Sequence, residues 1–133
     1  MSRIDWAVLC DVAFMDRLDR LCIIGVTRTL PVPSLPIALH QVTLVAHLTD
    51  IQPVEDIGIA VSVVAPHGGS VRPRASDSVV IEAVGEYVLA TLRDVPLSEE
   101  GLYRFEIALT GQPPTSVPVS VLTANRRIAA PYH

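Results

Sequence analysis

A strict alternation of apolar and polar residues limits this chain to folds that are built from β-strands. In residues 103–110, four large apolar side chains fall on one face of an extended strand, and Arg104 and Glu106 fall on the other. No stretch of useful length combines the 3.6-residue spacing of a helix with capping residues. We therefore predict an all-β protein in which most strands bury one face.

Short apolar stretches separated by turn residues recur along the chain. The turns are clearest at residues 66–70 (PHGGS) and 111–114 (GQPP). About seven or eight strands of this kind predict a single antiparallel β-sandwich, immunoglobulin-like or C2-like, over residues 1–125, with a tail at 126–133. The predicted strands cover residues 4–15, 21–27, 37–48, 57–64, 79–84 (either alone or continuous with 87–92), 102–110 and 117–123.

The N-terminal part of the chain predicts a hairpin. The polar segment Asp16–Arg20 forms its turn, and Gly25 in the second strand indicates a bulge or a close backbone approach. Pro31, Pro33 and Pro36 follow and impose an extended connector without ladder donors. Connectors of this kind often cross from one sheet to another.

Charge and composition exclude several classes of function. All ten basic residues are arginine, which removes a Schiff-base lysine, a phosphate-loop lysine and a lysine general base. A net charge of −4 argues against non-specific nucleic-acid binding and against docking on anionic membranes. Acidic residues interrupt the N-terminal apolar residues and the longest apolar runs are short, so we expect neither a signal peptide nor a membrane span, and a cytoplasmic location.

The two cysteines, Cys10 and Cys22, flank the predicted turn and would lie almost opposite each other if the hairpin strands pair. In an oxidising compartment such a pair would form a disulfide. In the cytosol both would be reduced, small and buried hydrophobic residues, and this is the interpretation that we favour.

The histidines do not form a recognisable catalytic group. His40 and His47 are seven residues apart and fall on opposite faces of one strand, and His40 is in phase with Val42 and Leu44, so we expect it to be a half-buried structural residue. No Gly-x-Ser-x-Gly elbow is present. We therefore predict that the protein is not an enzyme and has no catalytic residues. A small hydrolase that uses His40 or His47 is kept as a third hypothesis, after the two that follow.

The sequence offers one candidate metal site. The sequence has no Cys-x-x-Cys pair and no two histidines at same-face spacing, which argues against zinc. Asp50, Glu55 and Asp56 share one loop, and carboxylates in a sandwich loop can hold calcium. Acidic residues are also common in turns because they cap local backbone donors. We predict no metal and no cofactor, and keep a ligand-binding sandwich with a calcium-binding acidic loop as the second hypothesis.

Apolar residues on both faces of residues 21–26 and 57–64 lead to the first hypothesis. These stretches are either central strands or an outer face that pairs with another chain. We predict a non-enzymatic protein-interaction or structural module that associates with itself or serves as a subunit of a larger bacterial assembly. Its partner would be a protein, with no nucleic acid and no membrane, and the predicted interface residues are Ile24, Ile59 and Val61.

The N-terminal segments 5–11 (DWAVLCD) and 21–26 (LCIIGV), followed by Pro36, resemble a family of small uncharacterised bacterial β-sandwich proteins. Residues 101–105 (GLYRF) match the Tyr-x-Phe strand near the end of that family's pattern. The family pattern also has a basic residue before the Leu of its second strand, and Arg20 takes that place here. The resemblance implies a sandwich in the bacterial cytoplasm. The family has no established activity, so the resemblance assigns no catalytic positions.

Overall fold

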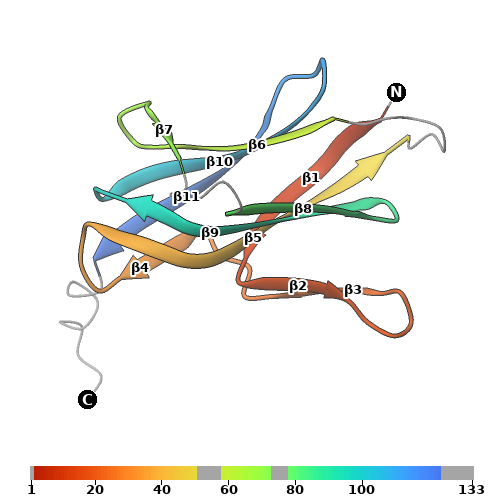
Figure 1. Cartoon of the computed structure of the whole chain (residues 1–133), viewed down its shortest axis with the longest axis horizontal. Coiled ribbons are helices and arrows are strands. Elements are labelled where there is room, and N and C mark those ends of the chain that lie inside the picture. The colour runs from red at the N-terminus through yellow and green to blue at the C-terminus, as the bar shows by residue number, and fades with distance from the viewer. Residues whose placement is uncertain (1, 51–57, 73–77, 124–133) are drawn as a thin grey trace.

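The computed structural model describes residues 2–50, 58–72 and 78–123, and the regular elements of these residues are all β-strands (Figure 1). A four-stranded sheet has the order β1-β5-β9-β8, and a five-stranded sheet has the order β4-β11-β10-β6-β7. The strands β2 and β3 form a separate hairpin. The strand bounds are β1 (Arg3–Cys10), β2 (Val12–Met15), β3 (Leu21–Ile24), β4 (Thr29–Val32), β5 (Ile37–Thr49), β6 (Ile59–Val64), β7 (Ser70–Val71), β8 (Val79–Val84), β9 (Tyr87–Leu97), β10 (Gly101–Leu109) and β11 (Thr115–Thr123).

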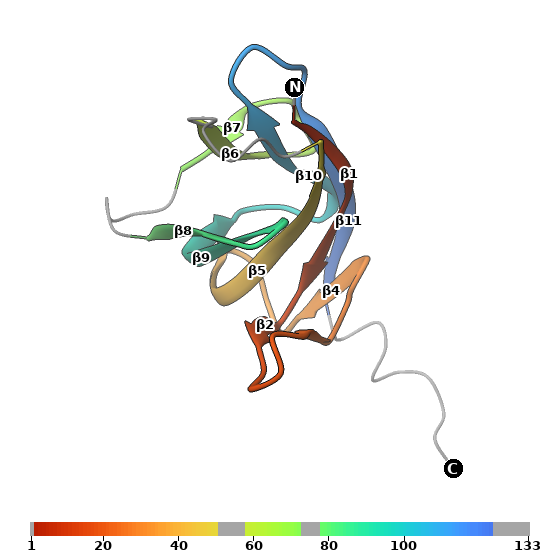
Figure 2. The ribbon, with the colours of Figure 1, turned by 90° about the vertical axis from the view of Figure 1, so that its right-hand side faces the viewer.

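The two larger sheets pack face to face around one hydrophobic core (Figure 2). Phe105 and Ile107 of β10 are fully buried in it, as are Leu44 of β5 and Val88 of β9. Arg104, between the buried residues of β10, is exposed. The predicted alternation and the predicted β-sandwich are both confirmed.

The strand order is that of an immunoglobulin-like sandwich. In such domains the first, second, fifth and fourth main strands form one sheet, and the third, sixth and seventh form the other. Here β1, β5, β9 and β8 take the first set of positions, and β6, β10 and β11 take the second. The hydroxyl of Tyr103 donates a hydrogen bond to the carbonyl of Glu99 at 3.0 Å, which is the tyrosine corner of this fold. These features decide between the two predicted types of sandwich.

Eleven strands are present in the described residues, rather than seven or eight, because one predicted strand is divided and because β4 and β7 lie where no strand was predicted. The predicted strand 4–15 ends at Cys10 and resumes at Val12, because the Asp11 N–H turns toward the carbonyls of Ile24 (3.1 Å) and Gly25 (3.2 Å). Residues 79–84 and 87–97 are separate strands joined by a turn at Gly85.

The proline-rich connector contains a strand that the sequence did not predict. β4 includes Pro31 and pairs in parallel with β11, from Thr29 opposite Ser120 to Val32 opposite Thr123. It lies at the edge of its sheet, where a proline without an N–H is tolerated. The chain then enters β5, which pairs with β1 in the four-stranded sheet, so the connector crosses from the sheet of β4 back to the sheet in which the chain began.

The predicted hairpin is confirmed, and it packs on the four-stranded sheet from outside the sandwich. Val45 and Leu89 point away from the main core and are 0% and 6% exposed, because Ala13, Leu21 and Ile23 of the hairpin segment pack against their cluster. The hairpin projects beyond the end of β1 (Figures 1 and 2). It is therefore an addition to the sandwich rather than a part of either large sheet.

Two residues fix the shape of the hairpin. Asp16 accepts hydrogen bonds from the N–H groups of Leu18 (2.8 Å) and Arg20 (2.9 Å), and the Arg20 backbone bond is the main cause that holds the pKa of Asp16 below its ordinary value. Gly25 has φ +75°, and a Cβ there would lie 2.6 Å from Oδ2 of Asp11. The close backbone approach predicted at Gly25 is confirmed.

The predicted position of the two cysteines opposite each other is wrong. Cys22 lies opposite Phe14 in the hairpin, whereas Cys10 lies opposite Thr43 in the four-stranded sheet. Both thiols are free, and Cys10 is buried while Cys22 is half-buried. Burial is the main cause that raises the pKa of Cys10 to about 11, so its thiol stays protonated and unreactive at neutral pH.

Candidate interaction site

Large exposed apolar side chains gather on the hairpin. The described residues contain nine such side chains, and five of them lie within a 15-residue segment. A single exposed apolar residue is common on any protein surface, but a cluster marks a surface that another molecule covers. The five are Val12, Phe14, Leu18, Ile24 and Val26.

Strand alternation determines how the hairpin exposes one apolar face. Ala13 and Ile23 are opposite each other and face the sheet, so the neighbouring pairs point away from it. Val12 is opposite Ile24, and Phe14 is opposite Cys22. The outward side chains of Val12, Phe14 and Ile24 are 37%, 45% and 54% exposed. We call the surface of Val12, Phe14, Cys22 and Ile24 the outer hairpin face.

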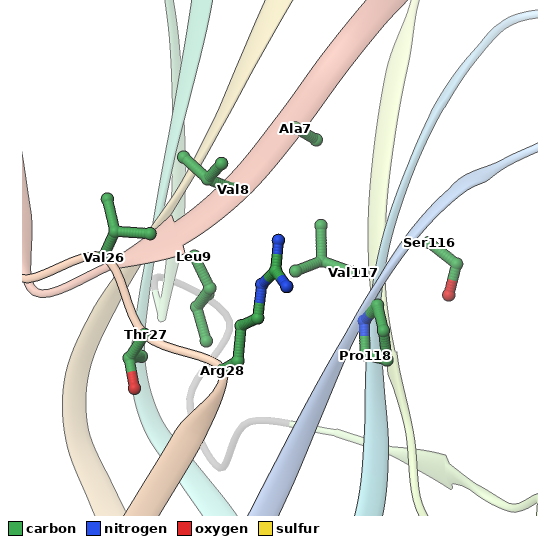
Figure 3. A pocket seen from close by; sticks show the side chains of 9 residues that line it. All are labelled: Ala7, Val8, Leu9, Val26, Thr27, Arg28, Ser116, Val117 and Pro118. Carbon is green, nitrogen blue, oxygen red and sulfur yellow. The ribbon is translucent and has the colours of Figure 1, made fainter.

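A pocket of about 350 Å³ lies next to the hairpin, between β1 and β11 (Figure 3). Residues 7–9 of β1 form one wall, and residues 116–118 of β11 form the other. Residues 26–28, which lead from the hairpin into β4, line it as well. We call this pocket the groove. Val26, which is 58% exposed, lines the groove and directly follows the hairpin, so the two surfaces are continuous.

Arg28 brings a positive charge to the groove. Its guanidinium reaches between Val8 of β1 and Val117 of β11 (Figure 3). Arg3 and Arg20 each lie within 4 Å of a carboxylate, whereas the structure gives the Arg28 side chain no hydrogen bond or ion pair within the described ranges. The groove thus offers an exposed guanidinium to a carboxylate from another molecule.

The three predicted interface residues lie in two different places. Ile24 belongs to the outer hairpin face. Ile59 and Val61 lie on β6 in the five-stranded sheet, and both pack partly against the sandwich core. The structure therefore brings Ile24 together with Val12 and Phe14, but does not bring Ile59 and Val61 to the same surface.

The predicted acidic loop is described only at its start. Asp50 lies 3.5 Å from Arg3 in an ion pair, and Glu55 and Asp56 are outside the described residues. Within residues 2–50, 58–72 and 78–123, no three His, Cys, Asp or Glu side chains are grouped so that they could hold a metal ion. The calcium hypothesis gains no supporting observation.

His40 is exposed, so the prediction of a half-buried His40 is wrong. Leu39 and Val42 both pack on the core, although they are three residues apart, so the face of β5 that is buried changes between them. The irregularity lies opposite Asp94, which has φ +53°. The register of β5 and β9 is the same on both sides of this point, so a local break in the pairing, rather than an added residue, turns His40 toward solvent.

His47 is part of a cluster that the sequence did not reveal. Its ring stacks on Trp6, with centroids 5.7 Å apart, and lies 5.2 Å from the ring of Tyr87. Its Nδ1 is 3.3 Å from Asp5 and its Nε2 is 3.1 Å from Glu86. Both ring nitrogens of His47 thus face carboxylates, and the hydrolase hypothesis gains no supporting observation from this cluster.

Only the strand register brings this cluster together. Trp6 of β1 is opposite His47 of β5, which in turn is opposite Tyr87 of β9. The groove was missed for the same reason, because its three segments are distant in the sequence. The sequence does place Arg28 in the segment between Gly25 and Pro31, where the chain leaves the hairpin. Nothing in the sequence shows that β11 lies beside this segment.

A family model covers residues 5–122 of the chain and is described as a family of unknown function (DUF6941). The chain belongs to this family. The predicted resemblance to an uncharacterised family is confirmed, and the DUF6941 description assigns neither an activity nor a site. No curated protein matches the chain.

Among solved structures, the chain is similar to the M1 domain from titin, with a TM-score of 0.36 and 10% sequence identity. The similarity covers 73% of this chain and 86% of the titin domain. Similarity at this level adds nothing to the assignment of the fold, which rests on the strand order and the tyrosine corner. The described residues include no helix long and apolar enough to cross a membrane.

Proposed function

We propose that this DUF6941 protein is a non-enzymatic protein-interaction module that binds another protein chain through the outer hairpin face. The observation that carries the proposal is the concentration of exposed large apolar side chains between Val12 and Val26. The bound chain is either a second copy or a different subunit of a larger assembly. A cytoplasmic location and a single domain over residues 1–125 belong to the same proposal.

The chemistry of the outer hairpin face supports this role. Its four side chains are uncharged, and interface centres are depleted of charged residues. Each square ångström of apolar surface that leaves water stabilises a complex by roughly 25 cal/mol before the costs of association. Charged residues are found instead at the turn, where Arg20 and Asp16 form an ion pair of 2.7 Å. An apolar centre with a polar rim is typical of a specific interface.

The hairpin is also placed where a partner can reach it. It projects from the sandwich and is held by the small cluster around Val45 and Leu89. Neither large sheet needs the outer hairpin face to complete its own core, because that core is formed between the sheets. Of the three predicted interface residues the proposal therefore uses Ile24, and Ile59 and Val61 stay predictions for the other sheet.

The test compares Ile24→Ser with Leu102→Ser. Leu102 lies on β10 and is 53% exposed, almost as much as Ile24 at 54%, so the two substitutions remove similar apolar surface at different places. Light scattering coupled to size-exclusion chromatography at several concentrations measures self-association. Affinity capture from the native host, with quantitation of each captured protein, measures binding to other subunits.

We expect Ile24→Ser to weaken self-association or to remove a captured protein, and Leu102→Ser to leave both unchanged. Thermal unfolding of both variants shows that they are folded. The proposal is wrong if the chain is a monomer whose captured proteins are the same for the wild type and Ile24→Ser. It is also wrong if Leu102→Ser has the same effect as Ile24→Ser.

A further inference from the structure

We propose that the groove binds an extended strand of a partner protein, which pairs with the bare edge of β11 and places an acidic side chain against Arg28. The inference rests on the proposed function, since it assumes an interaction module. It adds a second binding surface, the kind of segment that this surface takes, and the charge that the segment carries. Three features of the molecule support it: the unpaired edge of β11, the open groove beside that edge and the charge of Arg28.

The edge of β11 is only half covered. β4 pairs with residues 120–123 of β11 and does not extend along the residues of β11 that precede Ser120. The Ser120 N–H donates to the carbonyl of Arg28 at 2.9 Å, which shows that the backbone groups of Ser120 point toward the β4 side. Because successive residues of a strand point their backbone groups to opposite sides, those of Ser116 and Pro118 point the same way as those of Ser120. No described strand pairs with them on that side.

An unpaired strand edge is a template for another strand. The Ser116 N–H and the carbonyls of Ser116 and Pro118 provide one donor and two acceptors. Pro118 has no N–H of its own, which shortens the edge that a strand can use. The bare edge therefore fits a short extended segment that continues the line of β4, and it is too short to attract strands without further contacts.

The space beside this edge is open. The groove lies along residues 116–118, with β1 as its opposite wall (Figure 3). Its volume of about 350 Å³ is at the lower end of the range of pockets that bind small ligands, so it can accept side chains of an added segment. β1 is itself the outer strand of its sheet, so no other described strand fills the groove from that side.

Arg28 gives the groove its preference for charge. Its guanidinium stands in the groove beside the bare edge, and Arg28 immediately precedes β4 (Figure 3). Backbone pairing alone recognises any extended segment, whereas a guanidinium selects a carboxylate and can bind it through two hydrogen bonds. The occupant is therefore an extended segment with a glutamate or aspartate, supplied by a partner chain.

The test uses three peptide libraries with blocked termini. Each peptide has seven residues, the central residue is Glu, Gln or Lys, and the flanking positions are drawn from Val, Thr, Ile and Ser. Fluorescence polarisation measures binding to the wild type, to Arg28→Glu and to Arg72→Gln. Arg72 is exposed and lies outside the groove, so Arg72→Gln controls for the loss of a positive charge.

We expect the wild type to bind the Glu library about tenfold more tightly than the Gln library, with the Lys library weakest. Arg28→Glu should reverse the order of the Glu and Lys libraries, and Arg72→Gln should keep the wild-type order. Hydrogen exchange of the Ser116 amide should slow when the Glu library is bound. Equal binding of the three libraries, or an unchanged order in Arg28→Glu, overturns the proposal.

Two further results separate this inference from the proposed function. If no library binds but Ile24→Ser still removes a partner, the groove proposal is wrong and the interaction module stands. If the Glu library binds as expected while Ile24→Ser changes nothing, the groove stands and the outer hairpin face is wrong. If Arg28→Glu abolishes self-association in the absence of any peptide, the groove binds a second copy of this chain. That result overturns the proposal that a different protein supplies the strand.

Discussion

The four-stranded sheet carries apolar residues on both faces, and the two faces differ in what covers them. On the inner face, Leu44 and Val88 are completely buried by the whole of the second sheet. On the outer face, Val45 and Leu89 are buried by one hairpin of two four-residue strands. The comparison shows that the surplus of apolar residues in the sequence has two uses. One layer holds the domain together, and the other holds a projecting element in place.

The first way to test this comparison is to remove a large side chain from the inner layer. Phe105→Ala leaves a cavity in a core that cannot collapse easily between two sheets, because Phe105 is fully buried. We expect a loss of about 3–5 kcal/mol in the free energy of unfolding, measured by urea denaturation. Leu102→Ala on the same strand is the control, since an exposed side chain should change stability by less than about 0.5 kcal/mol.

The second prediction concerns the outer layer. Leu89→Ala removes one of three buried residues beneath the hairpin, and we expect a loss of about 2 kcal/mol, because the hairpin can settle into the space. Hydrogen exchange of the Ile23 amide should accelerate more than that of the core strands. Val88→Ala, at the next residue but facing the inner core, should not show this selective effect. Equal acceleration throughout both sheets would show that the hairpin is not a separate unit.

The tyrosine corner provides a third and smaller test, which concerns a polar contact at the rim of the inner layer. Tyr103→Phe keeps the buried ring and removes the hydroxyl that bonds to the backbone of Glu99. We expect a loss of about 1 kcal/mol in chemical denaturation. Tyr87→Phe is the matched control, because the structure shows ring contacts but no hydroxyl hydrogen bond for Tyr87 among the described residues. A similar loss in both variants would contradict a special role for the corner.

The smallest effect is expected at the hairpin turn. Asp16→Ala removes the acceptor for the N–H groups of Leu18 and Arg20, so the midpoint of thermal unfolding should fall slightly at pH 7. The pKa of Asp16 is below its ordinary value of 3.8 when the protein is folded. Its contribution is therefore complete above pH 3.8 and disappears as the pH falls through the lowered pKa.

The matching experiment compares the wild type with Asp16→Ala and Asp16→Asn between pH 7 and pH 2. The difference between the wild type and Asp16→Ala should shrink below about pH 4. Asp16→Asn keeps an oxygen acceptor for the backbone and should lie between the other two. A difference that is constant over the whole pH range would show that the ionised carboxylate does not stabilise the turn.

The sequence was sufficient to predict the elements whose signals are local. The alternation in β10 identified the inner face, and the turn at Asp16–Arg20 identified the hairpin. The close approach at Gly25 also followed from the sequence, because a glycine inside a β-branched run usually marks a bulge or a neighbouring segment that leaves no room for a side chain. Each of these features depends on residues that are near one another in the chain.

The features that could not be predicted depend on contacts between distant strands. A pattern with a period of two shows which residues share a face only while the strand is regular. The changes in β1–β2 at Asp11 and in β5 near His40 come from pairing with other segments. Most of the candidate site is of the same kind: Ile24 was predicted, whereas the groove needs β1, the segment before β4 and β11 to lie side by side.

The hairpin enters and leaves the sandwich at a single point. The N–H of Asp11 lies within 3.2 Å of the carbonyls of both Ile24 and Gly25, and the N–H of Thr27 donates to the carbonyl of Leu9. Residues 12–24 therefore form a hairpin insertion whose two ends are joined by backbone hydrogen bonds. A different hairpin of similar length that keeps apolar side chains over Val45 and Leu89 can replace them without redirecting β1 or β4. The domain is thus suited to engineering as a scaffold that displays a grafted binding loop beside a constant sandwich.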